Sequence, residues 1–407
     1  MREYDVLGES FFADPYPTLT ELRRVDPCWY DPQLEAHIVT RYSDVARVLQ
    51  DDGFSAQRVE QFARGAPSHL QDKVDVYVRQ LGRWILFVDP PNHTALRSRL
   101  LRCFGQHFMP LIAAAAESAV TKALDEIAAQ PAPDIVEHYA YPIPTNVLAS
   151  ILGISSDDIQ RFKRWTTDIF TLVGAGVADE AAVEVGYRGI TELRDYVLTL
   201  MEQKRRQPKD DVLSALAAPD HSDPSQQVDD EDVVGLFMSL IVAGHETSPN
   251  LIGNALHNIM SDQRCRNWVA SRGVMTEEAV EELIRHDGPV FSMLRRAKQD
   301  IVVAGRLVRE GEIVFSMLNA ANRDPRKFSD PDRLDFDRPT PAHVGLGVGI
   351  HRCVGGAMAR TVVREAVGRF LQRFPDATVA PGTRWQRNMS FRGLVTLPVH
   401  LHGVASA

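Results

Sequence analysis

Apolar residues recur every three to four positions over long parts of the chain, which is the spacing of one face of an α-helix. The stretch 233–260 is apolar through its first half, so we expect a central buried helix there. The segment 276–286 opens with Thr276, a residue type that caps helix N-termini. The same spacing predicts further helices over 15–24, 42–51, most of 111–217 and 354–374.

Short segments rich in β-branched and aromatic residues predict a smaller amount of β-structure. Residues 29–30 and 37–40 are expected to pair as a hairpin, and 394–401 is expected to form a C-terminal strand. Two more strands are expected over 300–304 and 307–315, with a turn near Gly311. The stretch 54–87 is expected to be irregular. The predicted fold is mainly α with a smaller β region, in a single domain over 1–407.

Composition narrows the class of protein. The 407 residues are 44% hydrophobic, which suffices for a sizeable core, and the net charge of −9 argues against nucleic acid or an anionic membrane as partner. Four widely spaced cysteines suit a reducing cytoplasm rather than a disulfide framework. The N-terminus lacks the features of a signal peptide, and the longest apolar run, 233–244, is too short to span a bilayer. A cytoplasmic monomer is expected.

The most informative stretch is 343–360, where a glycine-rich loop leads through Cys353 into the predicted helix 354–374. Glycines permit positive φ and leave room for a flat group beside the backbone. The positive end of a helix and nearby N–H groups favour the thiolate over the thiol. A thiolate on such a loop suits the proximal ligand of a haem iron.

Other interpretations of this loop compete with a haem ligand. A single cysteine is usually a small buried hydrophobic residue. A zinc site needs more ligands than His351 and Cys353 supply, and the chain has no CxxC pair. The glycines at 345, 347 and 349 do not continue into the G-x-G-x-x-G pattern of a dinucleotide loop.

The pattern Gly-x-Gly-x-His-x-Cys-x-Gly over 347–355 resembles the haem-binding signature of the cytochrome P-450 superfamily. The resemblance implies that Cys353 binds the iron of haem b and that His351 is a further haem contact. One departure is Leu346, where the family usually has a phenylalanine near the thiolate. This change is expected to alter packing and redox potential at the sulfur without removing a ligand.

A second motif, Asp-Pro-Pro-Asn-His-Thr-Ala-Leu-Arg, occupies 89–97. His93 and Arg97 are four residues apart and so lie on one helical face, which by itself is typical of a solvated basic surface. The likeness to the family's D-x-P-x-H-x-x-x-R motif implies that both bind haem propionates, a role that suits cationic donors. Arg295 fits the family's third propionate ligand, although the neighbouring Arg296 leaves that assignment open by one position.

The predicted central helix contains Ala-Gly-His-Glu-Thr-Ser at 243–248. A HExxH zinc helix would need histidine where the chain has Pro249. Local back-bonding by the two hydroxyl residues, with Glu246 facing the surface, is the simpler interpretation. The segment matches the family's oxygen-activation motif, which implies that Gly244 leaves space for dioxygen and that Glu246 and Thr247 deliver protons.

Glu282 and Arg285 lie three residues apart in the predicted helix 276–286. Such a pair alone contributes only about 0.2–0.5 kcal/mol when exposed. At this distance before Cys353 it resembles the family's E-x-x-R pair. The implied role is structural, since in the family the pair holds the segment before the haem loop, here 322–339.

Together these motifs imply a single-domain cytochrome P-450 fold with the haem between the central helix and the cysteine loop. The implied activity inserts one atom of O2 into a hydrophobic small organic molecule, by hydroxylation or a related oxidation, as in secondary metabolism. Three alternatives remain. A peroxide-using haem-thiolate enzyme or a non-catalytic haem sensor would have no use for Glu246 and Thr247. A haem-free helical protein would make all four motifs coincidental.

The chain ends soon after the last predicted strand, so electrons are expected from a separate ferredoxin and ferredoxin reductase. Arg352 and Arg360 are expected to meet an acidic surface on that partner. Candidate pocket residues are apolar or aromatic, and each could equally be a core residue. They are Trp84, Ile85, Phe87, Leu240, Ala243, Val290, Phe291, Met293 and Phe391.

Overall fold

The computed structural model describes residues 4–103, 108–174, 178–219, 228–339 and 342–402. Its contacts divide the chain into two compact units. Unit 1 comprises 1–54, 112–144 and 246–407, and unit 2 comprises 55–111 and 145–245. This division concerns contacts within the chain, and the single domain over 1–407 stays a prediction.

A five-stranded sheet in unit 1 has the strand order β1-β2-β7-β4-β3. The hairpin of β1 and β2 is antiparallel, β2 pairs with β7 in parallel, and β4 pairs with β7 antiparallel. The strand bounds are β1 Cys28–Asp31, β2 Ala36–Val39, β3 Phe54–Ser55, β4 Ser292–Ala297 and β7 Ile313–Met317.

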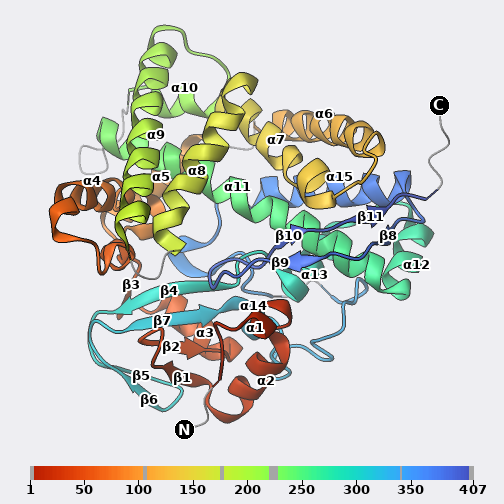
Figure 1. Cartoon of the computed structure of the whole chain (residues 1–407), viewed down its shortest axis with the longest axis horizontal. Coiled ribbons are helices and arrows are strands. Elements are labelled where there is room, and N and C mark those ends of the chain that lie inside the picture. The colour runs from red at the N-terminus through yellow and green to blue at the C-terminus, as the bar shows by residue number, and fades with distance from the viewer. Residues whose placement is uncertain (1–3, 104–107, 175–177, 220–227, 340–341, 403–407) are drawn as a thin grey trace. The chain divides into compact units, whose positions relative to one another are not determined.

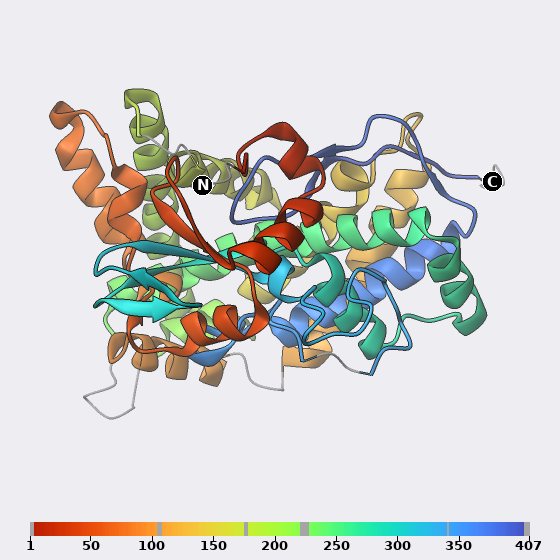
Figure 2. The same cartoon turned by 90° about the horizontal axis from the view of Figure 1, so that it is seen from below.

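Both faces of this sheet are buried, because alternate residues of each strand point to opposite sides. Phe315 packs in a cluster with residues of α1 (Glu9–Ala13) and α2 (Tyr16–Val25), whereas its neighbour Val314 packs with residues of α3 (Tyr42–Gln50). Figures 1 and 2 show these N-terminal helices beside the sheet strands. The sheet is therefore a layer between helices.

The remaining strands of unit 1 form two-stranded pairs. β5 (Ile301–Val303) pairs with β6 (Arg306–Val308), β9 (Arg384–Trp385) with β10 (Leu394–Thr396), and β8 (Thr378–Val379) with β11 (Val399–His400). The other helices of this unit are α6 Met109–Ala128, α12 Gln263–Arg272, α13 Glu277–Asp287, α14 Leu318–Ala321 and α15 Gly356–Arg373, with the last turns of α11 Asp230–Ser261.

Unit 2 is helical. Its helices are α4 Gln71–Leu81, α5 Asn92–Cys103, α8 Ile159–Gly174, α9 Glu180–Arg206 and α10 Val212–Ala217, with most of α7 Pro142–Leu152 and the first half of α11. α8 and α9 lie side by side (Figure 1). Short 3-10 turns occur at Val59–Ala63, Ser68–Leu70, Ile85–Phe87 and Ser156–Asp158.

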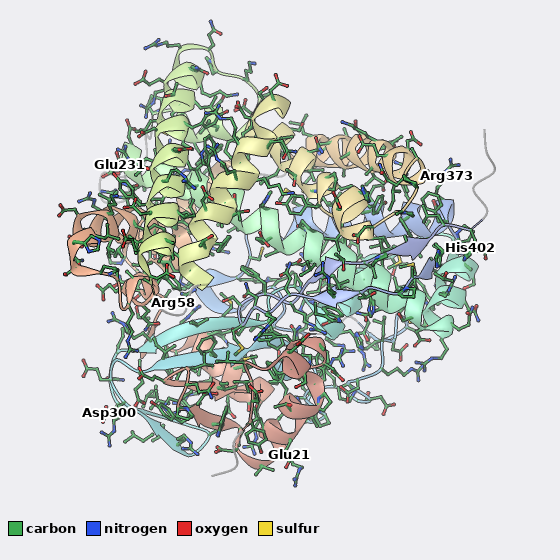
Figure 3. The ribbon with its side chains drawn as sticks, viewed as in Figure 1. Glu21, Arg58, Glu231, Asp300, Arg373 and His402 are labelled. Carbon is green, nitrogen blue, oxygen red and sulfur yellow. The ribbon has the colours of Figure 1, made fainter. Side chains whose placement is uncertain are left out.

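The first turn of α11 carries three acidic residues, and each is paired with an arginine. Arg83 Nη1 lies 2.7 Å from Asp232 Oδ1. Arg194 of α9 donates to Glu231, which is labelled in Figure 3, and Arg205 of the same helix pairs with Asp230. Carboxylates at a helix N-terminus complement its dipole, so this end of α11 is well suited to anchor α9.

The predicted fold class is confirmed: the chain is mainly helical with a small sheet region. Thr276 caps α13 by accepting a hydrogen bond from the Ala279 N–H at 3.2 Å. The prediction that 54–87 is irregular is wrong, because it contains α4. The residues Val74, Tyr77 and Leu81 form the buried stripe of that helix, which charged and polar neighbours obscure in the sequence.

Two further boundaries differ from the prediction. The turn predicted near Gly311 is confirmed at Glu310 and Gly311, and it divides the segment 307–315 between two strands, β6 and β7. The last helix begins at Gly356 rather than Val354, with Gly355 at its N-cap position. No described helix is both long enough and apolar enough to cross a membrane.

Candidate functional site

The Cys353 loop of unit 1 is held by its own backbone. The Cys353 N–H donates to the Leu346 carbonyl at 2.8 Å, which closes the loop across seven residues. Gly347 and Gly349 have φ of 71° and 72°, a region that glycine adopts without steric cost. A Cβ on Gly349 would also lie only 3.2 Å from the Leu49 carbonyl oxygen of α3. Glycine is therefore required at 349 on both counts.

Exposure distinguishes Cys353 from the other cysteine side chains that the structure describes. Cys28 and Cys265 are buried, and burial raises the pKa of each thiol to about 12. Cys353 is exposed. Cys353 precedes Gly356, the first residue of α15, by three positions and so lies outside the helix. Because a metal ligand must be a thiolate, the two buried cysteines are poor candidates and Cys353 is the suitable one.

Leu346 and Gly356 face each other at the base of this loop. The Leu346 Cδ1 atom lies 3.5 Å from where a Cβ on Gly356 would be. Leu346 is half-buried. The residue that departs from the family signature thus packs against the first turn of α15, and its carbonyl is the one bonded to Cys353.

Glu282 and Arg285 of α13 are fully buried and paired through two hydrogen bonds, of 2.7 and 2.8 Å. Arg285 also donates to the carbonyls of Asn322 and Pro331, at 2.9 and 2.7 Å. Arg338 donates to Glu282 Oε1 at 3.1 Å. Buried charges are tolerated when they are paired and hydrogen-bonded, as here. The pair therefore ties α13 to the segment 322–338.

Arg295 and Arg296 are adjacent on β4 and so point to opposite faces of the sheet. Arg295 is 3% exposed and donates to the Leu294 carbonyl at 2.9 Å, whereas Arg296 is half-buried. Only Arg295 thus holds its guanidinium inside unit 1. His351 is half-buried, in the 3-10 turn Gly349–His351 of the cysteine loop.

One stripe of α11 is less covered than the rest of that helix. Leu240, Ala243, Gly244 and Thr247 are half-buried, as is Glu246, while the residues between them are buried. The spacing of the first four is that of one helical face. The apolar and hydroxyl side chains on this face are thus partly exposed.

His245 lies off that stripe and is 3% exposed. Burial lowers the pKa of its imidazole to about 4, so it is neutral at physiological pH. On the neighbouring residue, a Cβ at Gly244 would lie 2.7 Å from Leu148 Cδ1. Glycine at 244 hence permits close packing of α7 on α11. Pro249 interrupts the same helix and removes one backbone donor.

The motif at 89–97 lies in unit 2, where it joins an extended segment to α5. The Asp89 carboxylate accepts hydrogen bonds from the Ser55 hydroxyl and from the Ala56 N–H, the latter at 2.9 Å. The Asp89 carbonyl accepts from the His93 N–H at 3.0 Å. His93 is 1% exposed and Arg97 is half-buried one turn further along α5. Asp89 therefore fixes the start of the helix that carries His93 and Arg97.

The candidate pocket residues fall into different surroundings. In unit 2, Trp84 stacks on Phe87 with ring centroids 6.3 Å apart, and the Arg58 guanidinium lies 4.7 Å from the Phe87 centroid (Arg58 is labelled in Figure 3). Ile85 between them is 8% exposed.

In unit 1, Phe291 is 2% exposed and packs against Phe11 in a core cluster. These are contacts of a core residue, and a place for Phe291 in the pocket stays a prediction. Val290 and Met293 are partly buried, and Val290 bridges to Phe391.

Comparison with known proteins now decides the family. The cytochrome P-450 family model matches residues 274–401. Cytochrome P-450 107B1 of Saccharopolyspora erythraea is 32% identical over 376 residues, covering 90% of this chain and 89% of that protein. The chain belongs to the cytochrome P-450 family. The monooxygenase PikC of Streptomyces venezuelae is 33% identical to this cytochrome P-450, with coverage of 97% and 92%.

The fold of this cytochrome P-450 agrees with solved structures over nearly its whole length. PksS, a polyketide-synthase cytochrome P-450 of Bacillus subtilis 168, has a TM-score of 0.85 and 28% identity, covering 98% of this chain and 100% of PksS. The family resemblance predicted from the sequence is confirmed. The protein is a cytochrome P-450 monooxygenase whose cofactor is haem b and whose co-substrate is O2.

The described residues fit a haem group. In this family the haem would be held by a cysteine thiolate, with cationic partners for its carboxylates. Within unit 1, Cys353 offers an exposed thiol, Thr247 of α11 is half-buried, and Arg295 holds a buried guanidinium. Nothing in this set conflicts with the cofactor that the family uses.

Sequence reasoning missed one network near the loop. Glu281 lies next to the predicted Glu282, but it bonds His343 and Arg360 instead. The partners are 62 and 79 residues away in sequence, so no spacing rule connects them. The only sequence signal is the pair of adjacent glutamates on one helix, since neighbouring helical residues must face different partners.

Proposed function

We propose that this cytochrome P-450 hydroxylates, or oxidises in a related way, a hydrophobic secondary metabolite of polyketide type. The observation that carries the proposal is the exposed Cys353 thiol in a closed glycine loop, together with family membership. The bound haem supplies dioxygen activation, and the protein supplies binding, orientation and protons. The non-catalytic sensor is set aside, because the family relatives are monooxygenases.

Cys353 is proposed as the iron ligand, with Arg295 as a propionate partner. The buried guanidinium of Arg295 favours it over Arg296. His93, Arg97 and His351 are proposed as further haem contacts on the resemblance of their motifs. Cationic groups favour the ionised carboxylates of the propionates.

Glu246 and Thr247 are proposed to hold and pass the protons that oxygen reduction consumes. Both are half-buried on α11, so they have access to a solvent or ligand space that a core residue lacks. The neutral His245 between Glu246 and Gly244 has a pKa of about 4 and does not compete as a proton donor at neutral pH. Presence of this pair favours an O2-using over a peroxide-using enzyme.

The substrate class rests on the relatives and on the side chains available. PksS belongs by name to a polyketide synthase. Leu240 and Ala243 contribute apolar surface to the half-buried stripe of α11, and Trp84, Ile85, Phe87, Val290, Met293 and Phe391 remain candidate lining residues. Apolar lining favours a hydrophobic ligand. Substrate binding is measured by the spin-state shift of the haem spectrum on titration with macrolactones.

Electrons are proposed to come from a separate ferredoxin and its reductase, in the cytoplasm. Arg352, beside Cys353, is exposed and suits an acidic docking surface. The parallel assignment of Arg360 needs correction: this side chain is only 25% exposed and donates to Glu281. The docking proposal therefore rests on Arg352. Neutralising it should slow reduction by the partner, most strongly at low salt.

The deciding experiment is the absorption spectrum of the dithionite-reduced protein under carbon monoxide. Thiolate ligation predicts a strongly red-shifted Soret band in the wild type, its loss in Cys353→Ala and its retention in Cys265→Ala. Cys265 is buried in the same unit and serves as the matched control. A red-shifted band that survives in Cys353→Ala would overturn the ligand assignment.

A further inference from the structure

One carboxylate in unit 1 holds both ends of the cysteine loop. Glu281 Oε2 lies 3.0 Å from His343 Nε2, and Glu281 Oε1 accepts from Arg360 Nε. His343 precedes Cys353 by ten residues and Arg360 follows it by seven. Glu281 itself lies on α13, so the two ends of the loop are joined to each other and to a helix outside it.

The N-terminal end of the loop is held by further hydrogen bonds besides the one between His343 and Glu281. His343 Nδ1 accepts from the Gly345 N–H at 3.1 Å, so the imidazole proton resides on Nε2 and is donated to Glu281. The Val344 N–H donates to Asn322 Oδ1 at 2.8 Å. Three consecutive residues before the loop thus have specified positions.

The C-terminal end of the loop is held through α15. Arg360 lies one turn after Gly356, and its Nη1 atom is 3.1 Å from where a Cβ on Gly356 would be. The guanidinium therefore lies along the first turn of the helix. Since Leu346 packs at the same glycine, Arg360 lies close to the point where the loop closes on itself.

Burial makes these bonds costly to lose. The exposed fractions of the side chains are 3% for His343, 13% for Glu281 and 25% for Arg360. Burial raises the pKa of the Glu281 carboxyl, but the bonds from His343 and Arg360 outweigh that effect and lower the pKa to about 2. Glu281 is hence ionised throughout the physiological range.

We propose that Glu281, with His343 and Arg360, is a positioning clamp that sets the geometry of the Cys353 thiolate toward the haem iron. The proposal rests on Cys353 being the iron ligand, as proposed above. The clamp is distinct from the Glu282–Arg285 pair, whose hydrogen bonds hold the segment 322–338. Adjacent glutamates of α13 therefore serve two separate parts of the chain.

The same two helices provide a matched control. Glu277 and Arg364 lie one turn from Glu281 and Arg360, with Arg364 Nη1 3.8 Å from Glu277 Oε1 and side chains 72% and 44% exposed. In Glu281→Gln the amide nitrogen must face one of two N–H donors, so one donor is left without an acceptor. In Glu277→Gln the same chemical change falls on an exposed pair, where little is lost.

The test follows the reduced carbon monoxide complex of both variants over time. For Glu281→Gln we expect the red-shifted band to convert to the unshifted form at least about tenfold faster than in wild type, with a changed haem reduction potential. Glu277→Gln should match wild type in both. Far-UV circular dichroism establishes that each variant is folded.

If Glu281→Gln does not fold, two milder variants still test the proposal. Arg360→Lys keeps the charge but removes the Nε donor, and His343→Gln keeps an N–H donor of similar reach. We expect intermediate conversion rates for both. Equal rates in Glu281→Gln, Arg360→Lys and Glu277→Gln would overturn the clamp, whereas absence of the red-shifted band in wild type would overturn the assignment of Cys353 instead.

Discussion

The three cysteine side chains that the structure describes have the same chemistry and very different surroundings. Cys28 and Cys265 lie in the interior of unit 1, where burial raises their thiol pKa to about 12 and keeps them protonated. Cys353 is exposed on a loop that contains two glycines with positive φ, Gly347 and Gly349. Local backbone geometry therefore selects which sulfur is available as a ligand.

At the same scale, Thr247 allows a direct test of the proton-delivery proposal. We expect Thr247→Ala to bind haem and substrate as wild type does, because the removed hydroxyl holds neither. Product formed per electron pair should fall at least about tenfold, since a positioned proton donor typically contributes about 10²–10⁴ in rate. The measurement is the electrons consumed, product formed and hydrogen peroxide released in one reaction.

Ser248→Ala is the control for this experiment. Ser248 is the next residue of α11 and is 6% exposed, so it lies away from the half-buried stripe that contains Thr247. Its loss should leave the coupling of electrons to product unchanged. Full coupling in Thr247→Ala would refute the proposed role of that hydroxyl.

At the scale of elements, glycines decide how closely the helices of unit 2 approach. A Cβ at Gly186 would lie 3.0 Å from Leu172 Cβ, and one at Gly189 would lie 2.7 Å from Asp168 Cβ. Both glycines are on α9 and both contacts are with α8. The two helices therefore pack with backbone close to backbone, at the cost of helix propensity on α9.

Gly189→Ala is expected to lower the free energy of unfolding by about 1–3 kcal/mol, because the added methyl overpacks a helix contact that includes the Trp165 carbonyl. Gly253→Ala on α11 is the matched control, for which the opposite change in stability is expected. Its Cβ would meet only Leu394 Cδ1, at an ordinary 3.8 Å. Helix propensity should then raise stability by roughly 0.5–1 kcal/mol. Urea unfolding of the two variants checks both signs, and stabilisation by Gly189→Ala would contradict the packing argument.

Local signals were enough to predict many elements of this chain. The Thr276 cap and the spacing after it predicted α13, and the predicted range 15–24 closely matches α2. Start positions were less certain where glycines precede a helix, as at Gly356, because glycine fits both loop and helix. The helix α4 was missed because its buried apolar and aromatic residues, Val74, Tyr77 and Leu81, lie among charged and polar ones.

The candidate site was predictable where its residues lie close in sequence. The 347–355 pattern and the pair Glu282–Arg285 are each local motifs whose side chains can be placed from spacing alone. Contacts between distant segments were not predictable in this way. The Glu281–Arg360 bond joins residues 79 apart, and it depends on how α13 and α15 pack.

At the scale of the whole molecule, several histidines are kept neutral by the fold. Burial lowers the pKa of His245 to about 4, and burial together with the nearby charge of Arg323 lowers that of His286 to about 3. Burial also lowers the pKa of His257. Each unfolded imidazole has an ordinary pKa near 6.5. The unfolded chain therefore binds more protons than the folded chain between these values.

The sign of the resulting pH dependence follows from linkage. Where the unfolded state binds more protons, the free energy of unfolding rises with pH. Stability should thus be highest above pH 6.5 and fall as the pH is lowered toward 4, the folded pKa of His245. The difference between the folded and unfolded pKa of His245 alone corresponds to a change of up to about 3 kcal/mol in the free energy of unfolding, at roughly 1.4 kcal/mol per pKa unit.

Urea unfolding at half-unit steps from pH 7.5 to 4.5 measures this dependence. His245→Gln should remain folded across the range and show a shallower loss of stability on acidification, because it removes one group that titrates only when unfolded. His69→Gln is the control, since the His69 side chain is 63% exposed. If His245→Gln and wild type lose stability in parallel, His245 is not the buried neutral group inferred here, and the acid sensitivity must come from His257, His286 or paired carboxylates such as Glu281. Those carboxylates can be separated from the imidazoles, because Glu281, with a folded pKa of about 2, loses its contribution only below its ordinary value near 4.5.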